Sequence, residues 1–115
     1  MAGLKKISTH VLDLMRGCPA NDVPVRLERE ESGAWRLLGS AHTDADGRCG
    51  QLLSHPELSP GRYRLCFDTA SYFRTQKVLS LYPTVEVVFE VREGESQFHI
   101  TLLLNANGYT TYRGS

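Results

Sequence analysis

The sequence predicts an all-β fold, namely an antiparallel β-sandwich with one short helix. Seven or eight short runs of alternating or β-branched residues are separated by turn residues such as glycine, proline, asparagine and aspartate. Strands at such even spacing, in a chain without a long apolar repeat of helical period, are typical of sandwiches. At 115 residues the chain can bury roughly two thirds of its unfolded surface. We therefore expect one domain over residues 1–115.

The expected strands follow one another along the whole chain. They cover residues 7–13, 23–29, 34–43, 62–69, 85–92, 97–104 and 109–112, with a weaker candidate at 49–53. Turn residues separate them at 16–19, 31–33, 44–47, 59–61 and 93–95. The helix is expected around residues 69–75.

The first strand alternates between two faces. Ile7, Thr9 and Val11 share one face, while Ser8, His10 and Leu12 point to the other. Because the first face is the more apolar one, we expect it to pack in the core. His10 is therefore predicted to point away from the core.

The run 97–104 alternates in the same way, with apolar residues at every even position. His99 and Leu103 lie on its other face. Residues 105–108 are turn residues that tolerate positive φ, and a strand of aromatic and β-branched residues follows them. This pattern predicts a β-hairpin at the end of the sequence.

The hairpin register places the last four residues, Tyr112-Arg113-Gly114-Ser115, beside a histidine. If the loop holds residues 105–108, Leu104 pairs with Tyr109, and counting along the ladder sets His99 opposite Gly114. Tyr112 then lies on the face of His99. Arg113 would point to the apolar side at some cost, so we expect the tail to leave the ladder near its end.

Two strands thus place a histidine and a leucine on the face away from the core. Leu12 and Leu103 are apolar residues where an isolated sandwich would show polar ones. Apolar residues on an outer sheet face are a common mark of association. We therefore expect a homo-oligomeric interface over this face.

Composition excludes several classes of partner. Thirteen basic residues balance thirteen acidic ones without clustering, so neither nucleic acid nor a membrane surface is expected as a partner. No apolar run is long enough for a signal peptide or a membrane span, and we expect a soluble, cytoplasmic protein. The three cysteines form no Cys-x-x-Cys pair, which predicts reduced structural thiols, with Cys66 as a small buried residue.

His10 and His99 are the first candidates for chemistry, because imidazole has a pKa of about 6.5 and exchanges protons near neutrality. Either histidine alone would more often be structural or solvated, but their shared face beside the polar tail favours a site. His42 and His55 lie near turns, and we expect them to be surface residues.

Arg48 follows the turn at 44–47, and its guanidinium could hold an oxygen-rich ligand or a developing oxyanion. A solvated turn arginine is the alternative. A calcium loop is excluded because Arg48 and Gly50 stand where it needs oxygen ligands. No spacing indicates zinc, a nucleophile elbow, a phosphate loop or a dinucleotide fingerprint, so we expect neither a metal nor a cofactor.

Four segments of the sequence resemble one known family. The segments are STHVLD at 8–13, GCPA at 17–20, DGR at 46–48, and the final hairpin with FHITLLL at 98–104 and GYTTYRGS at 108–115. Together they are similar to the transthyretin-like 5-hydroxyisourate hydrolases of urate breakdown. Hormone-carrying transthyretins share the fold but lack this combination of two histidines, an arginine and Tyr-Arg-Gly-Ser.

The resemblance implies a fold and an assembly. The family fold is a transthyretin-like sandwich of two four-stranded sheets, in which the strands bearing Arg48, His10 and His99 are neighbours in one sheet. Its members assemble as homotetramers, each a dimer of dimers, with active sites at the dimer–dimer interface. Some relatives are peroxisomal.

The resemblance also implies an activity. The expected hydrolase opens the cyclic amide of 5-hydroxyisourate to 2-oxo-4-hydroxy-4-carboxy-5-ureidoimidazoline without metal or cofactor. His99 is favoured as general base, and His10 would orient water or substrate or shuttle the proton. Arg48 would stabilise the oxyanion, while His10, Arg48, Tyr112 and Ser115 would bind substrate, Ser115 by its hydroxyl or a terminal carboxylate.

Two other functions remain open: a transthyretin-like small-molecule carrier, and a β-sandwich interaction module without a site. The chain also departs from the family pattern in three places. Gln97 stands where a histidine is frequent, Thr101 replaces a common proline, and residues 105–107 replace a Ser-Pro-aromatic turn. All three fall outside the proposed catalytic residues.

Overall fold

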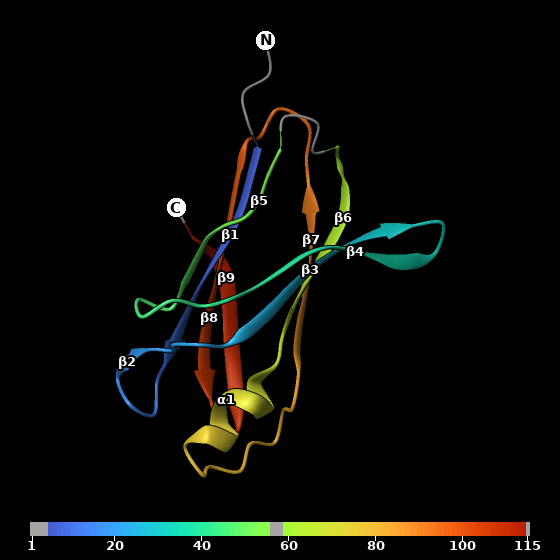
Figure 1. Cartoon of the computed structure of the whole chain (residues 1–115). Helices are drawn as coiled ribbons and strands as arrows, with labels where there is room; N and C mark the ends of the chain where they lie inside the picture. The colour runs from blue at the N-terminus through green and yellow to red at the C-terminus, as the bar shows by residue number, and fades with distance from the viewer. Residues whose placement is uncertain (1–4, 56–58, 115) are drawn as a thin grey trace.

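The computed structural model describes residues 5–55 and 59–114, and Figure 1 shows them as two β-sheets with one helix at one end of the sandwich. The first sheet contains β1 (Lys5–Asp13), β2 (Cys18–Pro19), β5 (Arg48–His55), β8 (Gln97–Asn105) and β9 (Gly108–Gly114). The second sheet contains β4 (Ala34–His42), β3 (Pro24–Glu31), β6 (Gly61–Phe67) and β7 (Val85–Val91), in that order. The helix α1 (Thr69–Thr75) links β6 to β7.

The transthyretin-like sandwich is confirmed, and the first sheet has one more strand than the predicted four. The additional strand, β2, has only two residues, too few to show an alternating pattern. It forms because a tight turn folds the chain back onto the end of β1. Asp13 Oδ1 accepts hydrogen bonds from the N–H groups of Met15 and Arg16 (2.9 and 3.1 Å), and Gly17 closes the turn at φ +68°.

The predicted antiparallel sandwich is confirmed except at one pair of strands. β1 and β8 run parallel, whereas every other pairing in the described part of the chain is antiparallel. The chain passes through the second sheet between β1 and β8, so no short turn dictates their relative direction. Alternation reveals which face a residue lies on, but not the direction of its neighbour.

The core lies between the two sheets and contains the residues that alternation assigned to it. On the first sheet Ile7 and Val11 are fully buried, and so is Leu102. On the second sheet Leu27 and Phe67 are fully buried. Each such side chain stabilises the fold by about 1.5–3 kcal/mol relative to an exposed one. The opposite face of β1 and β8 is thereby directed outward.

The register of the final hairpin is as predicted, with Leu104 opposite Tyr109 and His99 opposite Gly114. The ladder closes one pair further than expected, because Asn105 pairs with Gly108 and leaves a two-residue turn. Residues 105–108 all have negative φ. The turn therefore forms without the positive φ angles that its residue types would tolerate.

The expectation that the tail leaves the ladder is wrong, since Arg113 pairs with Ile100 and the strand continues to Gly114. β9 lies at the edge of its sheet, which lets the guanidinium reach out of the core. It lies 4.9 Å from the centre of the Phe98 ring, donates to Glu95 Oε1 at 2.6 Å, and is 43% exposed. A long arginine side chain can thus cover apolar surface while its charge stays hydrated.

The helix lies where it was predicted and supports the end of β1. Its Tyr72 hydroxyl donates a buried hydrogen bond of 2.6 Å to Asp13 Oδ2. No helix in residues 5–55 and 59–114 is long and apolar enough to cross a membrane. All three cysteines are free thiols, as expected, and burial raises the pKa of the buried Cys66 to about 11.

Candidate functional site

Three adjacent strands of the first sheet carry His10, Arg48 and His99 on its outer face. Arg48 on β5 lies opposite His10 on β1, and Ser8 on β1 lies opposite His99 on β8. The resemblance to the family predicted these strands to be neighbours, and the register confirms it. Residues separated by 38 and 51 positions in sequence (10 to 48, and 48 to 99) are thereby brought to one surface.

The turn before β5 determines the position of Arg48, the first residue of that strand. Asp44 Oδ1 accepts hydrogen bonds from the N–H groups of Asp46 and Arg48, both at 2.9 Å. Gly47 has φ +76°, and a Cβ at this position would collide with the carbonyl oxygen of Val11. The Val11 N–H in turn donates to the Gly47 carbonyl at 2.7 Å. Only glycine fits this close approach to β1.

The same turn orients His10. Its Nε2 lies 2.9 Å from the carbonyl oxygen of Asp46. A carbonyl oxygen only accepts, so Nε2 carries the hydrogen and, in the neutral ring, Nδ1 is free to accept one. The rings of His10 and His99 have their centres 6.4 Å apart at an angle of 37°.

His99 is held on two sides. Its Nδ1 lies 2.8 Å from Ser8 Oγ, and its Cδ2 faces Gly114, where a Cβ would approach to 2.7 Å. Burial of the ring lowers the pKa of His99 below its ordinary 6.5, and the positive charges of Arg48 and His10 lower it further. A neutral imidazole at pH 7 is able to accept a proton.

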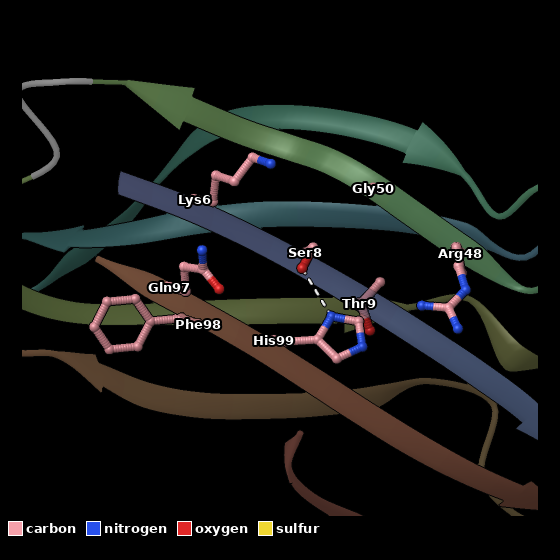
Figure 2. A pocket seen from close by; sticks show the side chains of 8 residues that line it. All are labelled: Lys6, Ser8, Thr9, Arg48, Gly50, Gln97, Phe98 and His99. Carbon is pink, nitrogen blue, oxygen red and sulfur yellow. Dashed lines mark hydrogen bonds between the residues drawn. The ribbon is translucent and has the colours of Figure 1, made fainter. Parts of the chain in front are cut away.

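A pocket of about 230 Å³ opens beside His99 on this face. It is lined by Lys6, Ser8, Thr9, Arg48, Gly50, Gln97, Phe98 and His99. Figure 2 shows Lys6 and Arg48 on opposite sides of the pocket, with His99 between them. Among the described residues that line the pocket, two side chains are cationic and none is a carboxylate, which suits an oxygen-rich or anionic ligand.

Two of the predicted site residues, Arg48 and His99, line this pocket. His10 is not in the lining, and its ring lies beside that of His99. Tyr112 lies opposite Thr101 on the same face, is 52% exposed, and does not line the pocket. Ser115 lies outside the described residues.

Sequence reasoning missed Lys6, Ser8 and Gln97 as lining residues. The signal was present, because each lies two or four positions before a candidate histidine on the same strand, and every second residue of a strand shares a face. The departure from the family pattern at Gln97 therefore falls in the pocket lining itself.

His42 lies on the second sheet, away from this pocket. It is exposed and its Nδ1 lies 2.8 Å from Asp22 Oδ1, which confirms it as a surface residue. The side chain of His55 is outside the described part of the structure. Among the residues that are described, no cluster of three or more His, Cys, Asp or Glu side chains could hold a metal ion.

Comparison with known proteins identifies the family. The family model described as HIUase/Transthyretin family matches residues 7–114. The mouse protein named 5-hydroxyisourate hydrolase is 44% identical over 111 residues, which cover 95% of this chain and 94% of the mouse protein. The solved structure of Klebsiella pneumoniae 5-hydroxyisourate hydrolase superposes with a TM-score of 0.86 at 35% identity, covering 96% of this chain and 99% of that one.

A relative with a different name is equally similar in shape. Transthyretin from Sparus aurata superposes with a TM-score of 0.89 at 30% identity, covering 94% of this chain and 95% of the fish chain. Backbone shape is thus common to relatives with different names, while the sequence is more similar to the hydrolases. Because the family model matches almost the whole chain and the mouse relative is 44% identical over almost its full length, this chain belongs to the HIUase/Transthyretin family.

Proposed function

We propose that this chain is a hydrolase that opens the cyclic amide of 5-hydroxyisourate to 2-oxo-4-hydroxy-4-carboxy-5-ureidoimidazoline, a step of urate breakdown. The observation that carries the proposal is that His99 and Arg48 line one pocket, with the ring of His10 beside His99. Burial lowers the pKa of His99, which favours the neutral form that a general base needs. The name of the mouse relative, at 44% identity, gives the substrate. The fold alone would not identify the substrate, because a sandwich of this kind hosts more than one function.

His99 serves as general base in this proposal. It accepts a proton from a water molecule as the oxygen of that water attacks the cyclic amide carbonyl carbon of the substrate. The ring C–N bond then breaks, and the protonated imidazole returns the proton to the departing nitrogen. The second proton of the water is released to solvent, so the product carries a carboxylate at the former carbonyl carbon. General-base catalysis of this kind contributes typically about 100- to 10,000-fold in rate.

Arg48 stabilises the negative charge that develops on the carbonyl oxygen. Its turn is fixed by Asp44 and Gly47, so little reorganisation is needed as the charge forms. Lys6 on the opposite side of the pocket is suited to the substrate oxygens remote from the reacting carbonyl.

His10 orients the attacking water or passes its proton onward. Its Nε2 is bound to the Asp46 carbonyl, so its Nδ1 is the atom available as acceptor. Tyr112, which pairs with Thr101 in the final hairpin, stays a predicted substrate-binding residue, and so does Ser115. We propose no metal and no cofactor for the reaction.

We also propose that the chain assembles as a homotetramer that covers the outer face of the first sheet. Leu12 and Leu103 lie opposite each other there and are only half-buried. Covering this face would remove apolar surface from water and enclose the open pocket. The mass of the particle in solution, measured by light scattering, tests the assembly. A cytoplasmic location, without nucleic-acid or membrane partners, stays a prediction.

The proposed reaction is tested by making 5-hydroxyisourate in place with urate oxidase and following its ultraviolet decay. The wild-type chain should accelerate the decay in proportion to its concentration. His99→Ala should abolish most of the acceleration while fold and assembly are kept. His42→Ala is the matched control, since it makes the same change at an exposed histidine of the other sheet.

The carrier alternative gives the opposite pattern in the same experiment. A carrier would bind ligand stoichiometrically, leave the decay rate unchanged and retain binding in His99→Ala. An interaction module would neither bind nor accelerate. Absence of acceleration by the wild-type chain would refute the hydrolase.

A further inference from the structure

We propose that Ser8 is a positioning residue that holds His99 as the tautomer with hydrogen on Nδ1, so that Nε2 is the atom that accepts the proton. The role assigned to His99 rests on the function proposed above, whereas the tautomer itself does not. Ser8 and His99 are direct partners in the parallel pairing of β1 with β8. Their Oγ and Nδ1 atoms are 2.8 Å apart, in a partly buried contact.

A hydroxyl can donate to or accept from an imidazole nitrogen, so the distance alone permits two tautomers. The charges around the ring distinguish them. In Figure 2 the second ring nitrogen of His99 faces the side of the pocket that Arg48 occupies. A cation nearby favours a lone pair over an N–H at that nitrogen. The hydrogen of the neutral ring therefore belongs on Nδ1, where Ser8 Oγ accepts it.

The surroundings also restrict how the ring can turn. Rotation by half a turn about the ring axis would exchange Nδ1 with Cδ2 and present a carbon to Ser8. The Cδ2 edge lies against Gly114 on β9, with almost no space between them. The hydrogen bond to Ser8 thus selects the orientation of the ring, and the close contact with Gly114 limits movement of the ring toward β9.

Ser8 keeps one role through the proposed cycle. When Nε2 takes the proton from water, the ring becomes an imidazolium and Nδ1–H still donates to Ser8 Oγ. The serine gains and loses no proton, and it forms no bond to substrate. It supports His99 in both charge states, because a hydrogen bond at one ring nitrogen determines which nitrogen is left to react.

The test compares Ser8→Ala and Ser8→Thr with wild type, and uses Ser40→Ala as a matched control on an exposed part of β4. Removing one hydrogen bond should shift the tautomer ratio and lower kcat by about 2- to 10-fold, with KM little changed. Threonine keeps the hydroxyl and suits a strand, so Ser8→Thr should recover most of the activity. Ser40→Ala should behave as wild type.

The tautomer is read directly by nitrogen NMR of histidine-labelled protein at a pH above the His99 pKa. We expect the hydrogen on Nδ1 in wild type and in Ser8→Thr, and a mixture in Ser8→Ala. Hydrogen on Nε2 in wild type, or an unchanged tautomer and kcat in Ser8→Ala, would overturn the proposal. If wild type fails to open 5-hydroxyisourate but the tautomer still depends on Ser8, the proposed function falls and the tautomer assignment stands.

Discussion

Gly114 offers a way to displace the His99 ring without changing any functional group of the site. It has no positive φ, so alanine can adopt its backbone conformation. The added Cβ, however, would lie 2.7 Å from His99 Cδ2 and 3.0 Å from Thr101 Oγ1. Carbon atoms in contact prefer about 3.5–4.0 Å. The ring must therefore move by about 1 Å, and a displacement of that size in a catalytic group costs on the order of 100-fold in rate.

The assay is kcat for decay of 5-hydroxyisourate, measured alongside the thermal unfolding midpoint. Gly114→Ala should lose activity while unfolding stays close to wild type, because β9 is an edge strand and the clash is with a side chain at its end. Gly108→Ala is the matched control in the same strand, since a Cβ there meets nothing within 4 Å. Wild-type kcat in Gly114→Ala would refute the claim that His99 must occupy its observed position.

Three further predictions concern charge and stability. Folding lowers the pKa of His99, so the contribution of this side chain to stability is intact above pH 6.5 and is lost as the pH falls through the pKa of the folded state. NMR titration of the folded protein should find the pKa of His99 below 6.5, and Arg48→Gln should raise that pKa. Gly47→Ala should destabilise the turn before β5 by about 1–3 kcal/mol, seen in urea unfolding, because φ is positive and a backbone carbonyl blocks the new Cβ. Tyr72→Phe should lower the free energy of unfolding by about 1.5–3 kcal/mol, because the buried Asp13 carboxylate loses a donor.

Alternation and turn residues were enough to predict most of the fold. The faces of β1 and β8 follow from a period of two, and the register of the last hairpin follows from its turn. Counting residues along that hairpin is therefore sufficient to place His99 opposite Gly114, as the ladder confirms. The two-residue β2 and the parallel pairing of β1 with β8 could not be predicted in this way. They depend on a side-chain cap at Asp13 and on long connections, which leave no local pattern.

The site was predictable in its residue types and less so in its contacts. Two histidines on one face indicated acid–base chemistry, and family resemblance brought Arg48 beside them. Ser8 was visible as part of a motif, but its bond to His99 exists only because β1 and β8 are neighbours. For Arg113 the prediction was wrong, because a charge on the inner face was expected to force the tail out of the ladder. The edge position of β9 lets this side chain reach Glu95, which a central strand would not allow.

In the proposed reaction, His99 is the base that opens the substrate ring. The most direct measurement is the initial rate at which a carbon-labelled substrate gains the product carboxylate, followed by carbon NMR for wild type, His99→Ala and His42→Ala at equal concentration. Wild type and His42→Ala should form the carboxylate rapidly, whereas His99→Ala should form it at a rate close to the uncatalysed one. Equal rates for wild type and His99→Ala would contradict this role of His99.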